Sequence, residues 1–160
     1  MAKFNLELPT EVMKDFQKLH NSADEIFGEM TRAGAEVVEK NMNNNAPPLV
    51  KGHVKLSKTY KTPSDGGINT KVYVSGYLPF STPNREFFTR KGGNGKEYST
   101  NKGVPVDFIA QLYEYGRSTA PFPKHPFMRK SFKKKEIEDA MLKRQDKKFE
   151  DLFGASDFLK

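Results

Sequence analysis

Cysteine is absent from this chain of 160 residues, which excludes disulfide bonds, thiolate chemistry and cysteine-based zinc sites. Long apolar runs are also absent. No stretch approaches the roughly 20 residues needed to cross a bilayer, and the opening residues MAKFNLELPTEV lack the basic-then-apolar layout of a signal peptide. We therefore expect a soluble chain that is made in the cytoplasm. Hydrophobic residues reach only 36% and charged residues 29%, so much of the surface must be polar or some segments must extend from the core.

Residues in a catalytic or metal-binding arrangement are also lacking. The histidines His20, His53 and His125 share no metal-ligand spacing with one another. The glycines within 92–95 do not match a phosphate loop or a dinucleotide-binding pattern, and no nucleophile turn of the GxSxG type occurs. Carboxylates within 136–139 share their predicted helix with lysine and arginine, which is typical of a solvated, ion-paired face. The sequence thus predicts no enzyme activity, no cofactor and no metal site.

The chain is basic, with a formal charge of +7 and a pI near 9.5. The densest basic run begins at Arg129 and continues through Lys130, Lys133, Lys134 and Lys135. Such a helical patch could contact DNA phosphates without reading sequence, so we hold these four lysines as candidate DNA-facing residues. The alternative interpretation is a charged helix start that keeps an assembly surface soluble.

Two long helices are predicted at the ends of a single domain spanning residues 1–160. The first covers Leu8 to Asn44, with a candidate break near Asn21 and Ser22 and a stop at the Asn-Ala-Pro-Pro run. Ser22 and Glu25 have the capping-box form that would start its second part. Three- and four-residue steps there predict one buried apolar stripe, consisting of Ala23, Ile26, Phe27, Met30, Ala33, Gly34, Val37 and Val38. The second helix is predicted over Pro126 to Phe153.

The segments between these helices have a β-rich composition. Residues 68–78 alternate as a strand. Residues 52–60 fit a short helix or a strand, and residues 104–115 fit a short helix or a β segment. Residues 79–103 are glycine-rich and polar, which indicates an insertion with a mobile hairpin tip or a loop that orders on contact. The predicted fold class is α+β, with a small antiparallel sheet packed against the N-terminal and C-terminal helices.

A motif near the C-terminus combines an aromatic-Glu-aromatic-Gly element with a proline-rich stretch and a Pro-Phe-Met-Arg helix start. Its first element is Tyr113, Glu114, Tyr115 and Gly116, and its last is Pro126, Phe127, Met128 and Arg129. The motif resembles the signature of the siphophage tail-component family, the head–tail connector or tail-completion proteins. The upstream helix, its Ala46-Pro47 turn and the basic stretch 54–60 are similar to the same family. The likeness covers about two thirds of the chain, whereas residues 48–52 and Arg117 depart from the family pattern.

The resemblance implies a structural virion protein at the head–tail junction, synthesised in the host cytoplasm. It would assemble as a homo-oligomeric ring, a hexamer or dodecamer, among connector, head-closure and tail-tube proteins, and DNA would pass through it. A nucleic-acid-binding module is the alternative function. For assembly we expect Tyr113, Tyr115, Phe127 and Met128 to be core or near-interface anchors, and Phe87 and Phe88 to belong to an arm that reaches a neighbour. Glu114, Gly116 and Arg129 of the same motif are further candidate interface or anchor residues.

Overall fold

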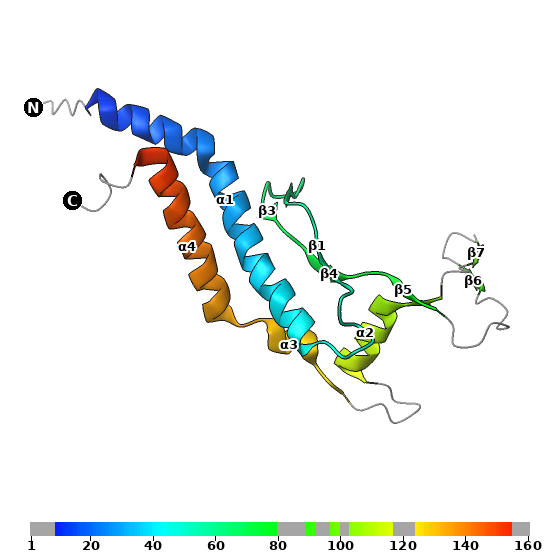
Figure 1. Cartoon of the computed structure of the whole chain (residues 1–160). Helices are drawn as coiled ribbons and strands as arrows, with labels where there is room; N and C mark the ends of the chain where they lie inside the picture. The colour runs from blue at the N-terminus through cyan, green and yellow to red at the C-terminus, as the bar shows by residue number, and fades with distance from the viewer. Residues whose placement is uncertain (1–8, 80–88, 92–96, 100–102, 117–123, 155–160) are drawn as a thin grey trace, which may run out of the picture. The chain divides into compact units, whose positions relative to one another are not determined.

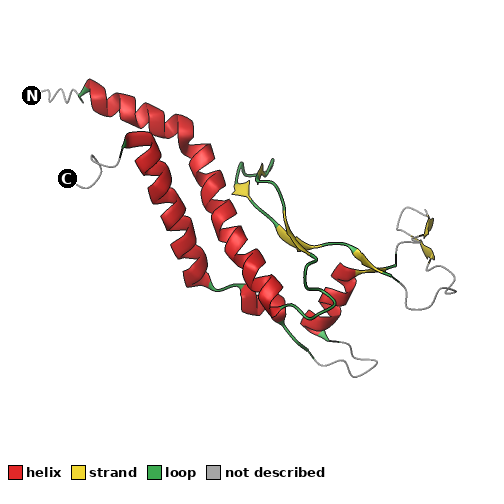
Figure 2. Cartoon of the chain, in the orientation of Figure 1, coloured by secondary structure: helices red, strands yellow, loops and turns green. Residues whose placement is uncertain are grey.

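The computed structural model describes residues 9–79, 89–91, 97–99, 103–116 and 124–154 (Figure 1). The described residues contain four helices and four antiparallel pairs of short strands, coloured by type in Figure 2. The predicted α+β class, with a long N-terminal helix, small antiparallel elements and a C-terminal helix, is therefore confirmed. The chain divides into two compact units, one of residues 1–37, 58–71 and 134–160, the other of residues 38–57 and 72–133. The assignment of residues 1–160 to one domain stays a prediction.

The N-terminal helix α1 runs without interruption over Thr10–Asn45. The predicted break near Asn21 and Ser22 is wrong, and so is the capping box that Ser22 would have formed with Glu25, because both residues lie inside the helix. Asn and Ser have modest helix propensity, but burial of an amphipathic face outweighs such small differences.

The predicted apolar stripe of α1 is largely buried. Four of its residues are buried, namely Ile26, Ala33, Gly34 and Val38. Three more are half-buried, namely Ala23, Met30 and Val37. Phe27 differs, since 54% of it is exposed.

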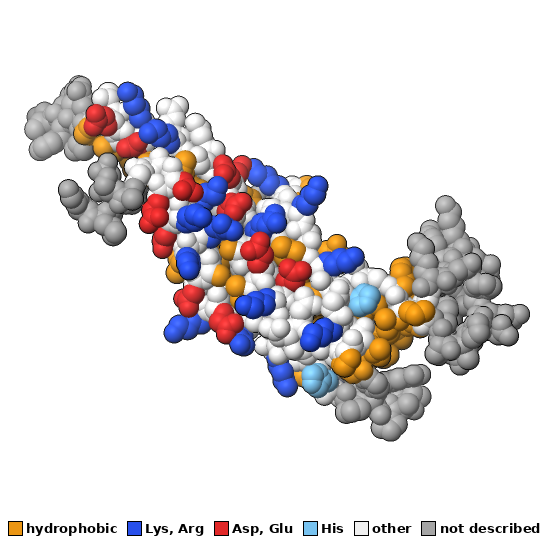
Figure 3. Space-filling model, viewed as in Figure 1, with side chains coloured by type: hydrophobic (Ala, Val, Ile, Leu, Met, Phe, Trp, Pro, Cys, Tyr) orange, Lys and Arg blue, Asp and Glu red, His pale blue; other side chains and the backbone are white. Residues whose placement is uncertain are grey.

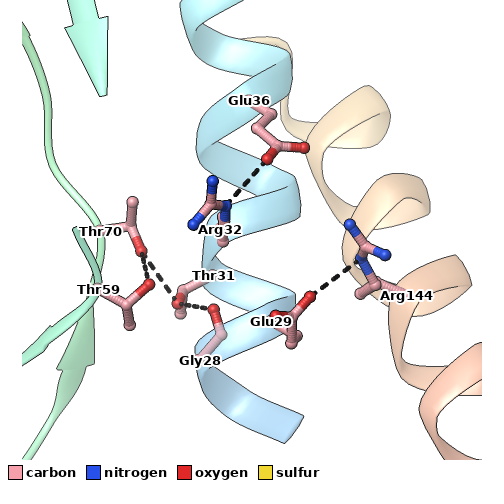
Figure 4. A network of polar contacts seen from close by, with 8 residues as sticks. All are labelled: Gly28, Glu29, Thr31, Arg32, Glu36, Thr59, Thr70 and Arg144. Carbon is pink, nitrogen blue, oxygen red and sulfur yellow. Dashed lines mark hydrogen bonds and ion pairs between the residues drawn. The ribbon is translucent and has the colours of Figure 1, made fainter. Parts of the chain in front are cut away.

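In the first unit, helix α4, Lys134–Phe153, runs antiparallel to α1 (Figure 1). Lys148 Nζ lies 2.6 Å from Glu25 Oε1. Arg144 Nε lies 3.5 Å from Glu29 Oε2 (Figure 4). Gly34 lets the two helices approach closely, because a Cβ atom at this position would lie 3.1 Å from side-chain atoms of α4. Small residues at a helix crossing allow such an approach.

A hairpin packs on another part of α1 in the same unit. Its strands β2, Tyr60–Lys61, and β3, Ile68–Asn69, pair antiparallel. The hydroxyl of Thr70 lies 3.1 Å from that of Thr59 and 3.4 Å from that of Thr31 on α1 (Figure 4). These hydroxyl contacts connect the hairpin to the helix.

The second unit contains the remaining strands and two short helices. Strand β1, Val54–Leu56, pairs with β4, Val72–Val74, and β5, Tyr77–Leu78, pairs with β8, Val104–Pro105. Strands β6, Thr89–Lys91, and β7, Glu97–Ser99, pair antiparallel within the predicted insertion. The choice between a mobile hairpin tip and a loop that orders on contact stays a prediction. Helix α2 covers Val106–Tyr115 and α3 covers Phe127–Ser131. Residues 52–60 thus contain strand rather than helix, and residues 104–115 contain both.

Two further predictions need correction. The single strand expected over residues 68–78 is three short strands, β3, β4 and β5. Gly76 between the last two has a φ of 122°, which favours glycine and bends the chain. The single C-terminal helix is two helices, because Phe132 leaves the helical region with ψ at 82°. Ser131 ends α3 with a hydroxyl that donates to the Phe127 carbonyl at 2.6 Å, a local bond that competes with helix continuation.

Candidate assembly site at the α2–α3 junction

A buried carboxylate joins helices α2 and α3 within the second unit. Glu114 is only 2% exposed. Its Oε2 accepts a hydrogen bond from the Met128 amide at 2.9 Å, and its Oε1 accepts one from the Arg129 amide at 3.3 Å and one from Arg129 Nε at 3.0 Å. One side chain of α2 therefore satisfies two amides in the first turn of α3.

The sequence around α3 explains why the helix needs this partner. The residue before the helix is Pro126, which forms no side-chain cap, so the first amides of the helix have no local acceptor. A carboxylate at such a position accepts hydrogen bonds from these amides and is attracted by the positive end of the helix dipole. Glu114 thus acts as an N-cap supplied from another helix.

The chain reaches this geometry through a turn and a short backbone contact. Gly116 ends α2 with a φ of 77°, a conformation that favours glycine, and its amide donates to Leu112 at 2.8 Å. The amide of His125 then donates to the Tyr113 carbonyl at 2.7 Å. The two halves of the family-like motif, 113–116 and 126–129, are consequently held side by side.

The interior side of the junction is fully packed. Phe127 and Ser131 have no exposed area. The amide nitrogen of the Asn45 side chain donates to the Ser131 hydroxyl at 3.1 Å, which joins α3 to the end of α1 in this unit. Val106 and Ala110, both fully buried, lie on the same side of α2 as Glu114. The inner side of the junction is therefore closed to solvent.

The outer side of the junction carries exposed aromatic and cationic groups. Tyr115 is 61% exposed, and the Arg129 guanidinium lies 5.2 Å from the centre of its ring. The hydrogen bond from Arg129 Nε to Glu114 positions the guanidinium for this cation–π contact with Tyr115. Phe108, which lies on the same face of α2 as Tyr115, is 54% exposed.

The other predicted site residues have varied positions. Tyr113 and Met128 are half-buried, and Lys130, Lys133, Lys134 and Lys135 are exposed. The Lys134 ammonium lies 3.6 Å from Glu138. Phe87 and Phe88 lie outside the described residues.

Sequence reasoning missed the structural role of Glu114 and the exposure of Phe108. A signal for Glu114 was present, because Val106, Ala110 and Glu114 follow one another at four-residue steps and so share a helix face. A carboxylate on an otherwise apolar face indicates a specific buried partner. Phe108 lies on the opposite face, where its exposure follows from the same periodicity.

Within the described ranges, no group of three or more histidine, aspartate or glutamate side chains could hold a metal ion. His53 is engaged locally, with its Nδ1 atom 3.2 Å from the Ser75 carbonyl. Among the residues that the structure places, no helix has the length and apolar character of a membrane span.

Comparisons with known protein families, with curated proteins and with solved structures find no match to this chain.

Proposed function

We propose that this chain is a structural protein of a tailed-phage particle, a ring-forming component of the neck that joins the head to the tail tube and lets DNA pass. The observation that carries the proposal is the Glu114 junction. The two halves of the motif that resembles the tail-component family are separated in sequence, yet the buried Glu114 carboxylate joins them through the first amides of α3. Because the helix start in the second half relies on the carboxylate from the first half, the motif is better interpreted as one structural element than as a chance likeness.

The chemistry of the outer surface supports a mechanical role. Ring assembly by a heterologous interface needs one surface that meets a different surface on the next subunit. Tyr and Arg dominate the binding energy of many protein interfaces because they combine large contact area with polar groups. Tyr115 and Arg129 are both exposed and already arranged by the junction.

The alternative, a nucleic-acid-binding module, rests on the exposure of Lys130, Lys133, Lys134 and Lys135. If all four lysines contacted phosphates of duplex DNA, the logarithm of the binding constant would fall with the logarithm of salt concentration with a slope of about −3.6. Retention of the purified chain on DNA with that slope would favour this alternative. A basic surface inside a ring through which DNA passes would bind more weakly as a single subunit.

The decisive experiment removes the gene from the phage genome that encodes it. We expect filled heads and separate tails in electron micrographs of the lysate, with joined particles restored when the wild-type chain is supplied in trans. Mass spectrometry of purified wild-type virions should identify the polypeptide. Intact, joined virions that lack it would refute the neck function.

A deletion of residues 85–101 tests the predicted arm. The purified variant should keep the circular dichroism spectrum of a folded monomer but fail to assemble. Replacement of the same residues by a Gly-Ser linker of equal length is the matched control for chain length, and it should also fail. Normal particle yield from either variant would contradict a role for this segment in assembly.

A further inference from the structure

Helix α2 exposes an apolar face that the described part of the chain leaves uncovered. Phe108, Leu112 and Tyr115 stand at four- and three-residue steps, so they lie on one side of the helix, opposite the buried Val106 and Ala110. We call this set the α2 face. Phe108 and Tyr115 are 54% and 61% exposed, and Leu112 is half-buried. The space-filling view shows hydrophobic side chains gathered over α2 and β5, whereas mixed charges cover the α1–α4 pair (Figure 3).

One edge of the α2 face carries an ordered series of polar groups. Asp107, Gln111 and Tyr115 follow one another at four-residue steps, and all three are exposed. The Arg129 guanidinium lies 5.2 Å from the centre of the Tyr115 ring, and its Nε donates to Glu114 at 3.0 Å. The edge therefore has a carboxylate at the start of the helix, an amide in the middle and a cation at the end.

This order of charges makes the edge complementary to a copy of itself. Gln111 lies midway along it, four residues or about 6 Å of helix from Asp107 and from Tyr115. If two copies of α2 pack antiparallel about a twofold axis beside Gln111, the Asp107 of each copy meets the Arg129 of the other, and Phe108 meets Tyr115. In a parallel twofold pair the two edges would lie on opposite sides of the contact, so neither cation would meet a carboxylate.

The apolar part of such a contact is small. A fully buried Phe or Tyr contributes about 150–250 Å². About half of Phe108 and of Tyr115 is exposed, so the four rings of two copies would remove only about 400 Å² from water. Stable interfaces bury about 1,200–2,000 Å². The expected association is therefore weak, and the matching of charge selects a second copy as the partner.

We propose that the α2 face is a twofold docking surface for a second copy of this chain, with Asp107 of each copy paired to Arg129 of the other. The contact is isologous, because both subunits use the same surface. It differs from the heterologous contact that closes a ring, so the dimer covers Tyr115 and Arg129 in the free chain until assembly begins. That consequence rests on the proposed ring function, whereas the dimer itself does not.

The absence of cysteine makes a cross-linking test specific. A residue meets its own copy only near a twofold axis, so Gln111→Cys alone should form a disulfide between two purified full-length chains. Such a bond requires Cα atoms within about 7 Å of each other. Lys143→Cys, at an exposed position of α4, is the control and should stay monomeric on a non-reducing gel. No dimer band from Gln111→Cys, or equal bands from both variants, would overturn the proposal.

Sedimentation equilibrium of cysteine-free chains tests the charge pairing. Asp107→Lys places a cation against Arg129 twice, because symmetry repeats every substitution, and should raise the Kd of the dimer by about tenfold. Asp107→Asn removes only the attraction and should give an intermediate Kd. Asp139→Lys makes the same change of charge at an exposed position of α4 and should leave the Kd unchanged. Equal Kd values for Asp107→Lys and Asp139→Lys, with unchanged circular dichroism spectra, would overturn the pairing.

These measurements use the purified chain, so their outcome is separate from that of the gene deletion. A dimer formed by a polypeptide that is missing from virions would refute the neck function and leave the interface standing. A chain that is present in virions but never cross-links through position 111 would overturn the dimer alone.

Discussion

Removal of the Glu114 carboxylate should destabilise the second unit more than any surface change. In Glu114→Ala, the amides of Met128 and Arg129 lose a charged acceptor in a site where the side chain was only 2% exposed. Each such bond contributes about 1.5 kcal/mol. The Arg129 side chain is 68% exposed, so solvent screens its ion pair with Glu114. Loss of this ion pair should cost only about 0.5 kcal/mol. The free energy of unfolding should therefore fall by about 3.5 kcal/mol.

Thermal unfolding followed by circular dichroism measures this effect. For a chain of this length, about 3.5 kcal/mol corresponds to a decrease in Tm of about 7–14 °C. Glu114→Gln keeps the shape and one acceptor oxygen, so about half that decrease is expected. Glu138→Ala is the matched control, since it removes an exposed glutamate 3.6 Å from Lys134 and should change Tm by less than about 2 °C. If the Tm of Glu114→Ala equals that of Glu138→Ala, the capping role of Glu114 is refuted.

Three further predictions follow from close contacts and charges. Gly103→Ala should cost roughly 2–5 kcal/mol in chemical denaturation, from backbone strain and overpacking, because its Cβ would lie 1.9 Å from the Leu78 carbonyl oxygen. Gly34→Leu should lower the free energy of unfolding by about 1–3 kcal/mol because it forces α4 away from α1. Even a Cβ atom at this position would lie 3.1 Å from the Ile137 and Met141 side chains of α4. The Lys148 hydrogen bond and charge lower the pKa of Glu25 below 4.5, so this ion pair should stabilise the fold above that pH and lose its effect as pH falls through the lowered pKa.

Matched substitutions separate these effects from general damage. Gly52→Ala shares a positive φ of 83° but meets no atom within 4 Å, so it should cost only about 1–2 kcal/mol. A cost equal to that of Gly103→Ala would exclude the steric explanation. Arg32→Leu, on an exposed part of α1, should leave the helix pair intact. The stability lost in Glu25→Gln should shrink in acid. If the stability of this variant falls with pH in parallel with that of the wild-type protein, the ion pair is refuted.

The features that the sequence predicted well depend on local periodicity. The apolar stripe from Ile26 to Val38 located the buried side of α1, because side chains three and four residues apart share a helix face. The end of α1 after Asn45 also followed from a local rule, since the prolines that follow cannot continue a helix.

The features that the sequence did not predict depend on contacts between distant residues. The helix break at Phe132 accompanies the Asn45 contact to Ser131, which pairs residues far apart in the chain. The capping role of Glu114 likewise depends on amides that lie beyond the proline-rich stretch. Residues 68–78 divide into short strands because they bend between partners, and alternation alone does not encode such bends.

The short ladder between β5 and β8 makes the segment between them a natural graft point. Leu78 and Val104 are backbone partners, so the two ends of any intervening sequence are already brought together by the fold. Doubling the length of a loop closed in this way adds only about 0.6 kcal/mol of closure entropy. A peptide epitope or a fluorescent reporter inserted between these residues should leave the body of the protein intact, which offers a route to label the subunit without altering its helices.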